Sequence, residues 1–231
     1  MLVAHWVFCG GHRGSNPLKD ACRNFPDMIL EGPAGNKALI TPDGLAVGSA
    51  PSGTSPETTT RWAISGPASG YRGPTLTNKT LVSWLMLQGL PSAATAGSAI
   101  TIQNSDGTIF DGVVFSEKET DRWSEGSENF LRYQPFMPGY RETTTGSLVQ
   151  IAITYAETGP GNVQITGYRN GVSIGQYTTG NARSFTTAQV VLGARQQIHQ
   201  PALPPIGNLW AFISEIRIYD EALTAADIAG L

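Results

Sequence analysis

The chain has 231 residues, of which 40% are apolar, 27 are Gly and 15 are Pro, and only 14% are charged, where an ordinary soluble domain carries about 25%. These values disfavour helical bundles, coiled coils and disordered charged tails, and they favour an all-β sandwich, which often runs to about 200–250 residues as one domain. The net charge is -3 without a Lys/Arg cluster, and no apolar run approaches the roughly 18 residues of a membrane span, so we expect neither nucleic-acid binding nor membrane insertion.

Strand-like patterns begin at the amino terminus. The alternating segment LVAHWVF (2–8) predicts the opening strand, and the apolar run LVSWLMLQGL (81–90) has the length of a strand. Residues 99–104 and 108–115 flank Asp106-Gly107, a dipeptide that favours a two-residue hairpin turn. We therefore expect an antiparallel pair of strands in this region.

The second half of the chain continues this pattern. Residues 147–157 alternate between apolar and polar side chains. Residues 162–177 alternate on both sides of Asn170-Gly171, a dipeptide that tolerates the positive φ angles of a tight hairpin. Further strands are predicted at 188–195 and 209–220, so strands separated by turn residues fill most of the sequence, as in a sandwich.

A short helical turn is predicted at the carboxyl terminus. Thr224 followed three residues later by Asp227 is a variant of the capping box, which predicts a helix N-cap at Thr224. Leu223 and Ile228 have the spacing of a hydrophobic staple.

Three Gly-, Pro- and Ser/Thr-containing stretches predict long loops, at 48–60, 116–129 and 197–208. Long loops that join sandwich strands are where binding sites usually lie. No internal repeat is visible, and we place no domain boundary in these loops.

The chemically distinctive side chains favour structural roles. Trp6, Trp84 and Trp210 lie inside strand-like runs, so we expect core packing with each indole N–H bonded at the sheet face. Cys9 and Cys22 are compatible with a disulfide that closes a small loop and equally with two free thiols. The histidines are isolated in the sequence and are expected to pack or to lie at the surface rather than to bind metal: His5, His12 and His199.

Four parts of the sequence together resemble a known family. They are LVAHWVF with LKDACRNFPDMILEG, then KTLVSWLMLQGL, then LVQIAITYAE with GNVQITGYRNGVSIG, and finally LWAFISEIRIYDEALTAADIAGL. The pattern resembles the laminin-G-like, concanavalin A-like jelly-roll module of bacterial secreted and surface multidomain proteins. The insert GVVFSEKETDRWSEGSENFLRYQPF is similar to modules of the planctomycete type. The likeness covers nearly the whole chain, and its last segment is the most specific.

The resemblance implies an all-β fold, a two-sheet antiparallel jelly-roll sandwich whose first and last strands are neighbours. Because both ends of the chain have strand character, we expect residues 1–231 to form a single domain. The resemblance also implies an extracellular, periplasmic or cell-surface location, in a longer protein whose neighbouring domains are partners.

An enzyme is not expected. Sandwich glucanases of this fold class place three carboxylates on one strand, and a retaining mechanism needs a carboxyl pair about 5–5.5 Å apart. The nearest pattern here is Glu119, Asp121 and Glu125, which has one residue too many, in a polar stretch that predicts a solvated loop. No nucleophile elbow, zinc-protease or phosphate-loop motif occurs.

The resemblance further implies a structural calcium ion held by oxygen ligands. Asp20 and Asn24 match the family's Lys-Asp…Asn loop and are the candidate metal ligands. Cys9 and Ser214 stand where the family commonly has carboxylates, which weakens such a site. The alternative is that Asp20 and Asn24 cap a tight turn. No other cofactor is expected.

Residues 121–141 have the composition of a glycan site, because carbohydrate recognition pairs aromatic faces with side chains that hydrogen-bond hydroxyls. The candidate ligand-binding residues are Arg122, Trp123, Arg132, Tyr133 and Tyr140. The alternative is that Trp123 and Phe130 fasten a long loop onto the sandwich.

The sequence therefore predicts a non-catalytic carbohydrate-binding or adhesion module, with a polysaccharide or the glycan of a glycoprotein as its partner. Two other classes stay open. One is a structural or protein-interaction domain that binds no sugar, and the other is a sandwich-fold glycoside hydrolase or lyase with a displaced acid pair.

Overall fold

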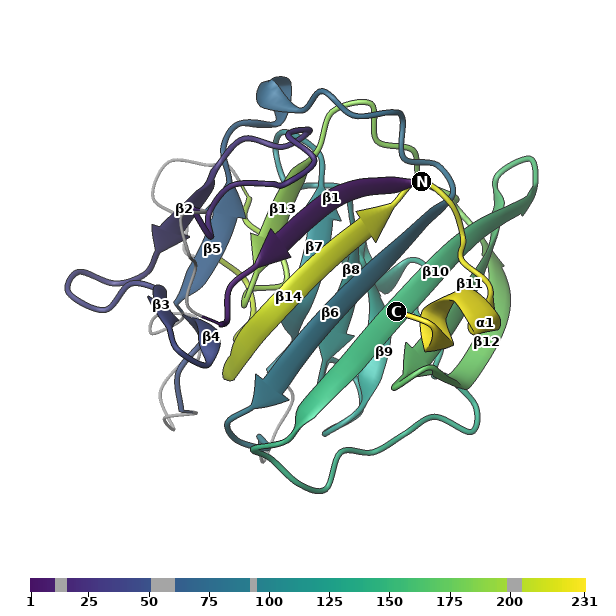
Figure 1. The fold of residues 1–231 in the computed structure, drawn as a ribbon. Coiled ribbons are helices and arrows are strands. Elements are labelled where there is room, and N and C mark those ends of the chain that lie inside the picture. The colour runs from purple at the N-terminus through teal and green to yellow at the C-terminus, as the bar shows by residue number, and fades with distance from the viewer. Residues whose placement is uncertain (11–15, 51–60, 92–94, 199–204) are drawn as a thin grey trace.

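Two antiparallel β-sheets lie face to face in the computed structural model, which describes residues 1–10, 16–50, 61–91, 95–198 and 205–231 (Figure 1). One sheet has eight strands and the other has six. This is the two-sheet antiparallel sandwich that the sequence predicts. Within the described residues, no helix is long and apolar enough to cross a membrane.

The eight-stranded sheet is built around the last strand of the chain. In spatial order its strands are β12 (Val172–Gly180), β11 (Asn162–Arg169), β10 (Leu148–Gly159), β6 (Lys79–Leu87), β14 (Ala211–Tyr219), β4 (Gly44–Val47) and β3 (Leu39–Thr41). One edge of β14 pairs with β6 along its whole length, and the other edge pairs first with β4 and then with β1 (Leu2–Val7). The first and last strands are therefore neighbours, as expected (Figure 1).

The six-stranded sheet contains the antiparallel pair of strands that the sequence predicts around Asp106-Gly107. Its order is β2 (Met28–Glu31), β5 (Trp62–Ser65), β13 (Gln189–Leu192), β7 (Gly97–Gln103), β8 (Phe110–Phe115) and β9 (Trp123–Ser127). The β7–β8 hairpin is confirmed, but its connection is longer than two residues, and Asp106 Oδ1 accepts a hydrogen bond from the Thr108 backbone N–H. In the eight-stranded sheet, β11 and β12 do meet in a two-residue turn, with φ of 48° at Asn170 and 77° at Gly171.

The space between the sheets is filled by alternate side chains of both. Leu81, Leu85 and Leu87 point inward from β6, and Val113 and Phe115 point inward from β8. Burying side chains of this size stabilises the fold by about 1.5–3 kcal/mol each relative to leaving them exposed.

The strand β9 differs from what the sequence predicts, because residues 116–129 were expected to form a solvated loop. Trp123–Ser127 instead pairs with β8 along its length, and all five of its residues are buried. Two inward positions carry Glu125 and Ser127 rather than apolar residues, so the usual strand alternation is missing from the sequence. Most of the predicted loops 48–60 and 197–208 lies outside the described residues.

The predicted carboxyl-terminal helix is confirmed as α1 (Ala225–Ala229). Thr224 caps it, and the capping box with Asp227 is complete. Ile228 packs on the outer face of the eight-stranded sheet against Val82 and Ala152. The helix therefore covers part of a sheet face that is otherwise turned to solvent.

The predictions for the tryptophan side chains are confirmed only in part, and the structure decides between the two alternatives for the cysteines. Trp6 is fully buried in the core, but its indole N–H has no hydrogen-bond partner among the described residues, contrary to expectation. Trp84 is not a core residue, because it lies half-buried on the outer face with the Arg217 guanidinium 4.9 Å from its ring centroid. Cys9 and Cys22 are free thiols, both half-buried, and burial together with Asp20 raises the pKa of Cys22.

Candidate functional site

The glycan segment predicted from the sequence starts at β9, where Trp123 turns inward. Only 2% of Trp123 is exposed, and its ring lies 4.7 Å from that of Phe115, centroid to centroid. Its Nε1–H donates to Glu142 Oε1 over 3.0 Å. The expectation that Trp123 contacts a ligand is therefore wrong for this structure, because the indole is buried against Phe115 and its N–H is bonded to Glu142.

Glu142 connects that buried indole to an exposed tyrosine. Arg169 donates to both carboxylate oxygens of Glu142, from Nε over 2.7 Å and from Nη2 over 3.0 Å. The same guanidinium lies 4.1 Å from the ring centroid of Tyr140, which is 41% exposed. Hydrogen bonding to Glu142 raises the pKa of Arg169, so the cation behind the ring is permanent. Tyr140 is thus held from behind by a fixed chain of partners and is open to solvent in front.

Two further arginines lie next to this tyrosine. Arg122 and Arg141 form an isolated antiparallel bridge, which places the start of β9 beside the segment that carries Tyr140. Arg141 Nη2 donates to Asp121 Oδ2 over 3.2 Å and has a side chain that is 61% exposed. Arg122 Nη1 donates to the Pro138 carbonyl over 3.4 Å. We call Tyr140, Arg122, Arg141 and Arg169 the Tyr140 platform.

Tyr133, another predicted ligand residue, is half-buried near the same arginines. Burial raises the pKa of its hydroxyl, with smaller contributions from Glu119 and Glu117, while the charge of Arg122 opposes the rise. Of the five predicted residues, the structure therefore leaves three with solvent exposure: Arg122, Tyr133 and Tyr140.

Arg132 lies inside the sandwich, so the prediction that it binds a ligand is also wrong for this structure. Its side chain is 1% exposed, and its Nε donates to Glu125 Oε1 over 3.1 Å. It also forms an ion pair with Asp111 and donates to the carbonyls of Phe110 and Asn181. A buried guanidinium needs this many acceptors, because burying a charge without partners is costly.

A second buried cation completes this group. Lys79 Nζ lies 2.8 Å from Asp111 Oδ2 and donates to the carbonyls of Thr77 and Arg183. Burial lowers the pKa of Lys79 and raises the pKa of Glu125 to about 8. We call Lys79, Asp111, Glu125 and Arg132 the buried charge cluster.

The three carboxylates that came nearest to a catalytic pattern each lie beside an arginine. Glu125 belongs to the buried charge cluster and is fully buried, while Asp121 pairs with Arg141. Glu119 is 44% exposed and lies 4.0 Å from Arg122 Nε.

The predicted calcium site is not supported, because the carboxylate oxygens of Asp20 already accept hydrogen bonds from the backbone. Asp20 is 4% exposed, and its Oδ1 accepts the backbone N–H groups of His5 and Cys22 over 2.9 and 3.0 Å. Its Oδ2 accepts those of Asn24 and Phe25 over 2.8 and 3.1 Å. A carboxylate offers about four lone-pair sites, so none is left for a cation. Within the described residues, no three His, Cys, Asp or Glu side chains gather as a metal site. Asp20 and Asn24 instead organise a tight turn, which was the alternative.

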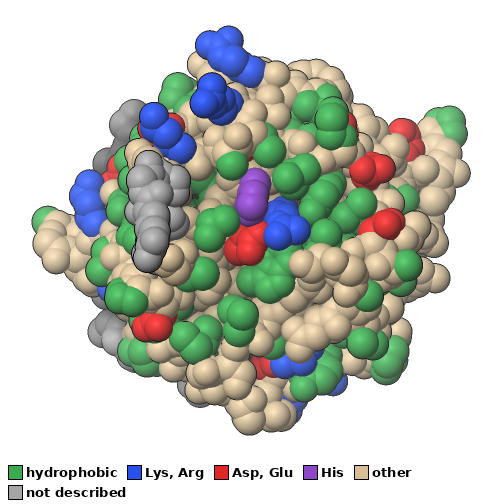
Figure 2. All heavy atoms as spheres, in the orientation of Figure 1, with side chains coloured by type: hydrophobic (Ala, Val, Ile, Leu, Met, Phe, Trp, Pro, Cys, Tyr) green, Lys and Arg blue, Asp and Glu red, His purple; other side chains and the backbone are tan. Residues whose placement is uncertain are grey.

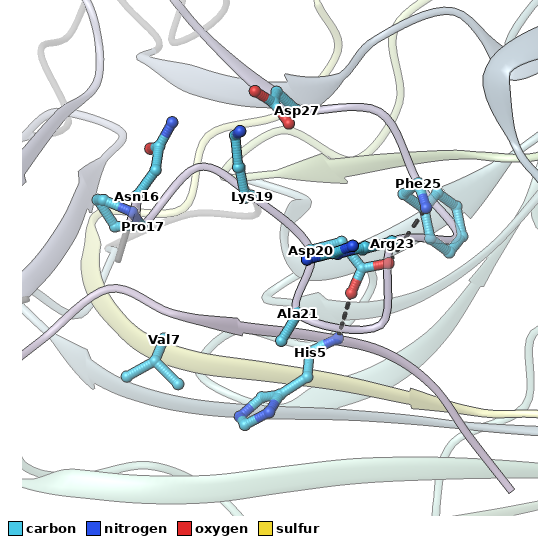
Figure 3. Close-up of a pocket in the computed structure, with 10 residues that line it drawn as sticks. All are labelled: His5, Val7, Asn16, Pro17, Lys19, Asp20, Ala21, Arg23, Phe25 and Asp27. Carbon is cyan, nitrogen blue, oxygen red and sulfur yellow. Dashed lines mark hydrogen bonds between the residues drawn. The ribbon is translucent and has the colours of Figure 1, made fainter. Parts of the chain in front are cut away.

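That turn forms one wall of a pocket that the sequence did not reveal (Figure 3). The cavity has a volume of about 650 Å³. The opposite wall is β1, which contributes His5 and Val7, and the rim carries the polar residues Asn16, Lys19 and Asp27. The lining residues are of mixed chemical type and form no recognisable sequence motif. Only the folded loop brings them together with β1.

The pocket opens next to the outer face of the eight-stranded sheet. His5 Nε2 lies 2.9 Å from Glu215 Oε1, and Arg217 Nε donates to that same oxygen over 2.6 Å. Figure 2 shows histidine, acidic and basic side chains together near the middle of this face, among hydrophobic ones. Arg217 also covers Trp84, so this face combines an aromatic ring with charged groups.

Comparisons with solved structures show the same fold at low sequence identity. Domain 4 of AbnA, a GH43 extracellular arabinanase from Geobacillus stearothermophilus in complex with arabinotriose, is 20% identical with a TM-score of 0.51, covering 99% of this chain and 97% of that one. Trypanosoma rangeli sialidase in complex with sialic acid is 15% identical with a TM-score of 0.58, covering 98% of this chain and 32% of that one. The SAP-like pentraxin of Limulus polyphemus is 15% identical with a TM-score of 0.50, covering 68% and 70%.

The chain thus spans about a third of the length of the sialidase. No curated protein matches the sequence. Residues 72–229, well over half of the chain, match the family Laminin_G_3, described as the concanavalin A-like lectin/glucanases superfamily. With its two antiparallel sheets and paired terminal strands, the chain belongs to this superfamily.

Proposed function

We propose that this chain is a non-catalytic carbohydrate-binding module that works outside the cytoplasm as part of a longer protein. Its family contains both lectins and glucanases, which supports a sugar as the ligand. One structural neighbour of matching length is an arabinanase domain in complex with arabinotriose. These likenesses support glycan binding in general. The location of the binding surface is argued from the residues of this chain.

The single observation that carries the proposal is the Tyr140 platform. A sugar ring presents C–H groups on one face, and these pack on an exposed aromatic ring. At about 25 cal/mol per Å², covering roughly 60 Å² of apolar ring stabilises a complex by about 1.5 kcal/mol, close to tenfold in affinity. The backbone bridge between Arg122 and Arg141 lies next to Tyr140 in the chain, and their guanidinium groups are hydrogen-bond donors of the kind that sugar hydroxyls accept. Because Arg169 and Glu142 fix the ring beforehand, little side-chain entropy is lost on binding.

A binding role without catalysis is supported by the state of the acidic residues. Glycoside hydrolysis needs two carboxyl groups that reach the scissile bond, one of them as acid. Glu125 is fully buried, and Asp121 is largely buried and bonded to Arg141. The test is to incubate the protein with a range of polysaccharides. Product release that is lost in Glu119→Gln and Asp121→Asn would overturn the non-catalytic assignment.

Binding is tested by calorimetric titration with soluble polysaccharides, arabinan included. We expect Tyr140→Ala to weaken binding about tenfold and Tyr140→Phe to keep it, because the ring rather than the hydroxyl makes the contact. Val172→Ala is the matched control, since Val172 is an apolar side chain 68% exposed outside the platform.

Unchanged affinity in Tyr140→Ala would refute the platform as the binding surface. If the unaltered protein binds none of the polysaccharides, the module is a structural or protein-interaction domain instead.

A further inference from the structure

The pocket beside β1 is separate from the Tyr140 platform and shares no residue with it. Its volume of about 650 Å³ falls within the roughly 300–1,000 Å³ that small-molecule sites occupy. A pocket of this size has room for one or two sugar units. The exposed ring of Tyr140, by contrast, contacts only one face of a sugar in a polysaccharide chain. The two surfaces therefore suit different parts of a glycan.

The wall of this pocket is held rigidly. The turn from Asp20 to Phe25 wraps around the Asp20 carboxylate, which accepts backbone N–H groups from within the turn and from His5 on β1. Phe25 anchors the end of the turn in the core, with its ring 5.6 Å from that of Trp6 and 4.6 Å from that of Tyr71, centroid to centroid. The wall is therefore built before any ligand arrives.

Arg23 is the residue that this turn presents to the pocket. It has a φ of 62°, in the left-handed region that a residue with a side chain rarely adopts. Backbone strain of this kind persists where the surroundings impose it and is frequent at ligand sites. The Asp20 carboxylate imposes it here, since it holds N–H groups on both sides of Arg23. The guanidinium itself forms no bond to any described residue.

The rim carries charged groups of both signs. Within the described part of the chain, the side chains of Lys19 and Asp27 form no ion pair or hydrogen bond. Figure 3 shows the polar ends of Asn16, Lys19 and Asp27 turned to the same side of the pocket. Lys19 only donates hydrogen bonds, and the Asp27 carboxylate only accepts them. A ligand that bonds to both side chains must therefore contain both an acceptor and a donor.

A hydroxyl group supplies both, because it has one donor hydrogen and two acceptor lone pairs. We propose that this pocket binds a terminal, uncharged sugar unit of a glycan, whose neighbouring hydroxyls bond Asp27, Lys19 and Arg23. The inference rests on the proposed function, since it names a second subsite for the same class of ligand. An anionic sugar fits less well because it would face Asp27, and a cation would face Lys19 and Arg23.

The experiment is a titration of the whole chain with trisaccharides, namely arabinotriose, maltotriose, cellotriose and chitotriose, followed by calorimetry or by NMR chemical shifts. We expect at least one to bind, with affinity falling about tenfold or more in Asp27→Ala. Asp43→Ala is the matched control, because Asp43 is an exposed aspartate whose side chain bonds to none of the residues that the structure describes, and we expect less than a twofold change. Tyr140→Ala is measured in parallel, with polysaccharide and trisaccharide.

The outcomes separate the two proposals. Polysaccharide binding that depends on Tyr140, together with trisaccharide affinity unchanged in Asp27→Ala, would overturn the pocket and leave the proposed function standing. Absence of any trisaccharide binding would also overturn the pocket. Tighter binding of glucuronate than of glucose would overturn the assignment of an uncharged sugar. Trisaccharide affinity that falls in Asp27→Ala and is kept in Tyr140→Ala supports two independent subsites.

Discussion

Asp20 and Arg132 are both buried charges, and the protein stabilises them in different ways. Asp20 accepts four backbone N–H groups, three of them from residues no more than five positions away. Arg132 depends on Glu125, on Asp111 and on carbonyls as far away as Asn181. The first charge is satisfied by a local turn, and the second by strands of the six-stranded sheet that only the fold brings together. Their environments therefore predict different responses to substitution.

The largest effect is expected at the buried charge cluster. Arg132→Ala removes a cation that bonds the side chains of Asp111 and Glu125 and leaves buried acceptors without donors, so we expect the free energy of unfolding to fall by about 3–5 kcal/mol. Urea denaturation measures this change. Arg141→Ala removes a guanidinium whose side chain is 61% exposed and is expected to cost at most about 1 kcal/mol. Equal losses for the two variants would contradict the comparison.

A smaller loss is expected in the turn. Asp20→Ala leaves four N–H groups without their acceptor, but the turn lies near the surface and water reaches part of it once the carboxylate is gone. We expect a loss of about 2–3 kcal/mol by the same denaturation measurement. Asp27→Ala, which breaks no side-chain bond to a described residue, is expected to change stability by less than about 0.5 kcal/mol. A loss in Asp20→Ala as small as this control would show that the turn does not depend on the carboxylate.

The effect expected on the pH dependence of stability is of similar size to that in the turn. Burial raises the pKa of Glu125 to about 8 in the folded protein, above its usual value of 4.5, and burial raises the pKa of Glu117 in the same direction. Between these pH values the folded state keeps a proton that the unfolded chain releases, so stability falls as the pH rises. A pKa difference of this size lowers the free energy of unfolding by about 3 kcal/mol between roughly pH 5.5 and pH 8, so we expect the Tm to fall by about 6–12 °C.

Glu125→Gln is the variant that sharpens this test, since glutamine keeps the shape of the protonated acid and does not titrate. We expect the fall in Tm between these pH values to be smaller in Glu125→Gln than in the unaltered protein. Asp106→Asn is the control, because its carboxyl group lies on an exposed hairpin and its pKa is lowered rather than raised, by hydrogen bonds from Thr108. A slope that is the same in all three proteins would show that Glu125 does not keep its proton.

Parts of the fold that depend on local patterns were predictable. The two-residue turn at Asn170-Gly171, the alternating strands β10 and β14, and the capping box at Thr224 are all readable because their interactions join residues close in sequence. The strand β9 was not readable, because two of its inward positions are polar: Glu125 bonds to Arg132, and Ser127 bonds to Glu125, instead of packing on apolar neighbours.

The same division runs through the candidate sites. Composition indicated residues 121–141 as a possible binding segment, where Tyr140 is exposed and Arg122 and Tyr133 are half-buried. It did not separate them from Trp123 and Arg132, whose burial depends on Glu142 and Asp111. The pocket at β1 left no signal, since its rim residues are common polar types without a motif.

The sequence by itself determined the strands with local alternation and the closing helix, because hydrophobic period and turn chemistry act over a few residues. Composition favoured an all-β sandwich, and the pairing of the two ends was implied only by the family resemblance. Only the tertiary structure decided which aromatic and charged side chains face solvent. That choice depends on contacts between distant strands, such as Arg169 behind Tyr140 and Asp111 beside Arg132, and a linear pattern carries no record of them.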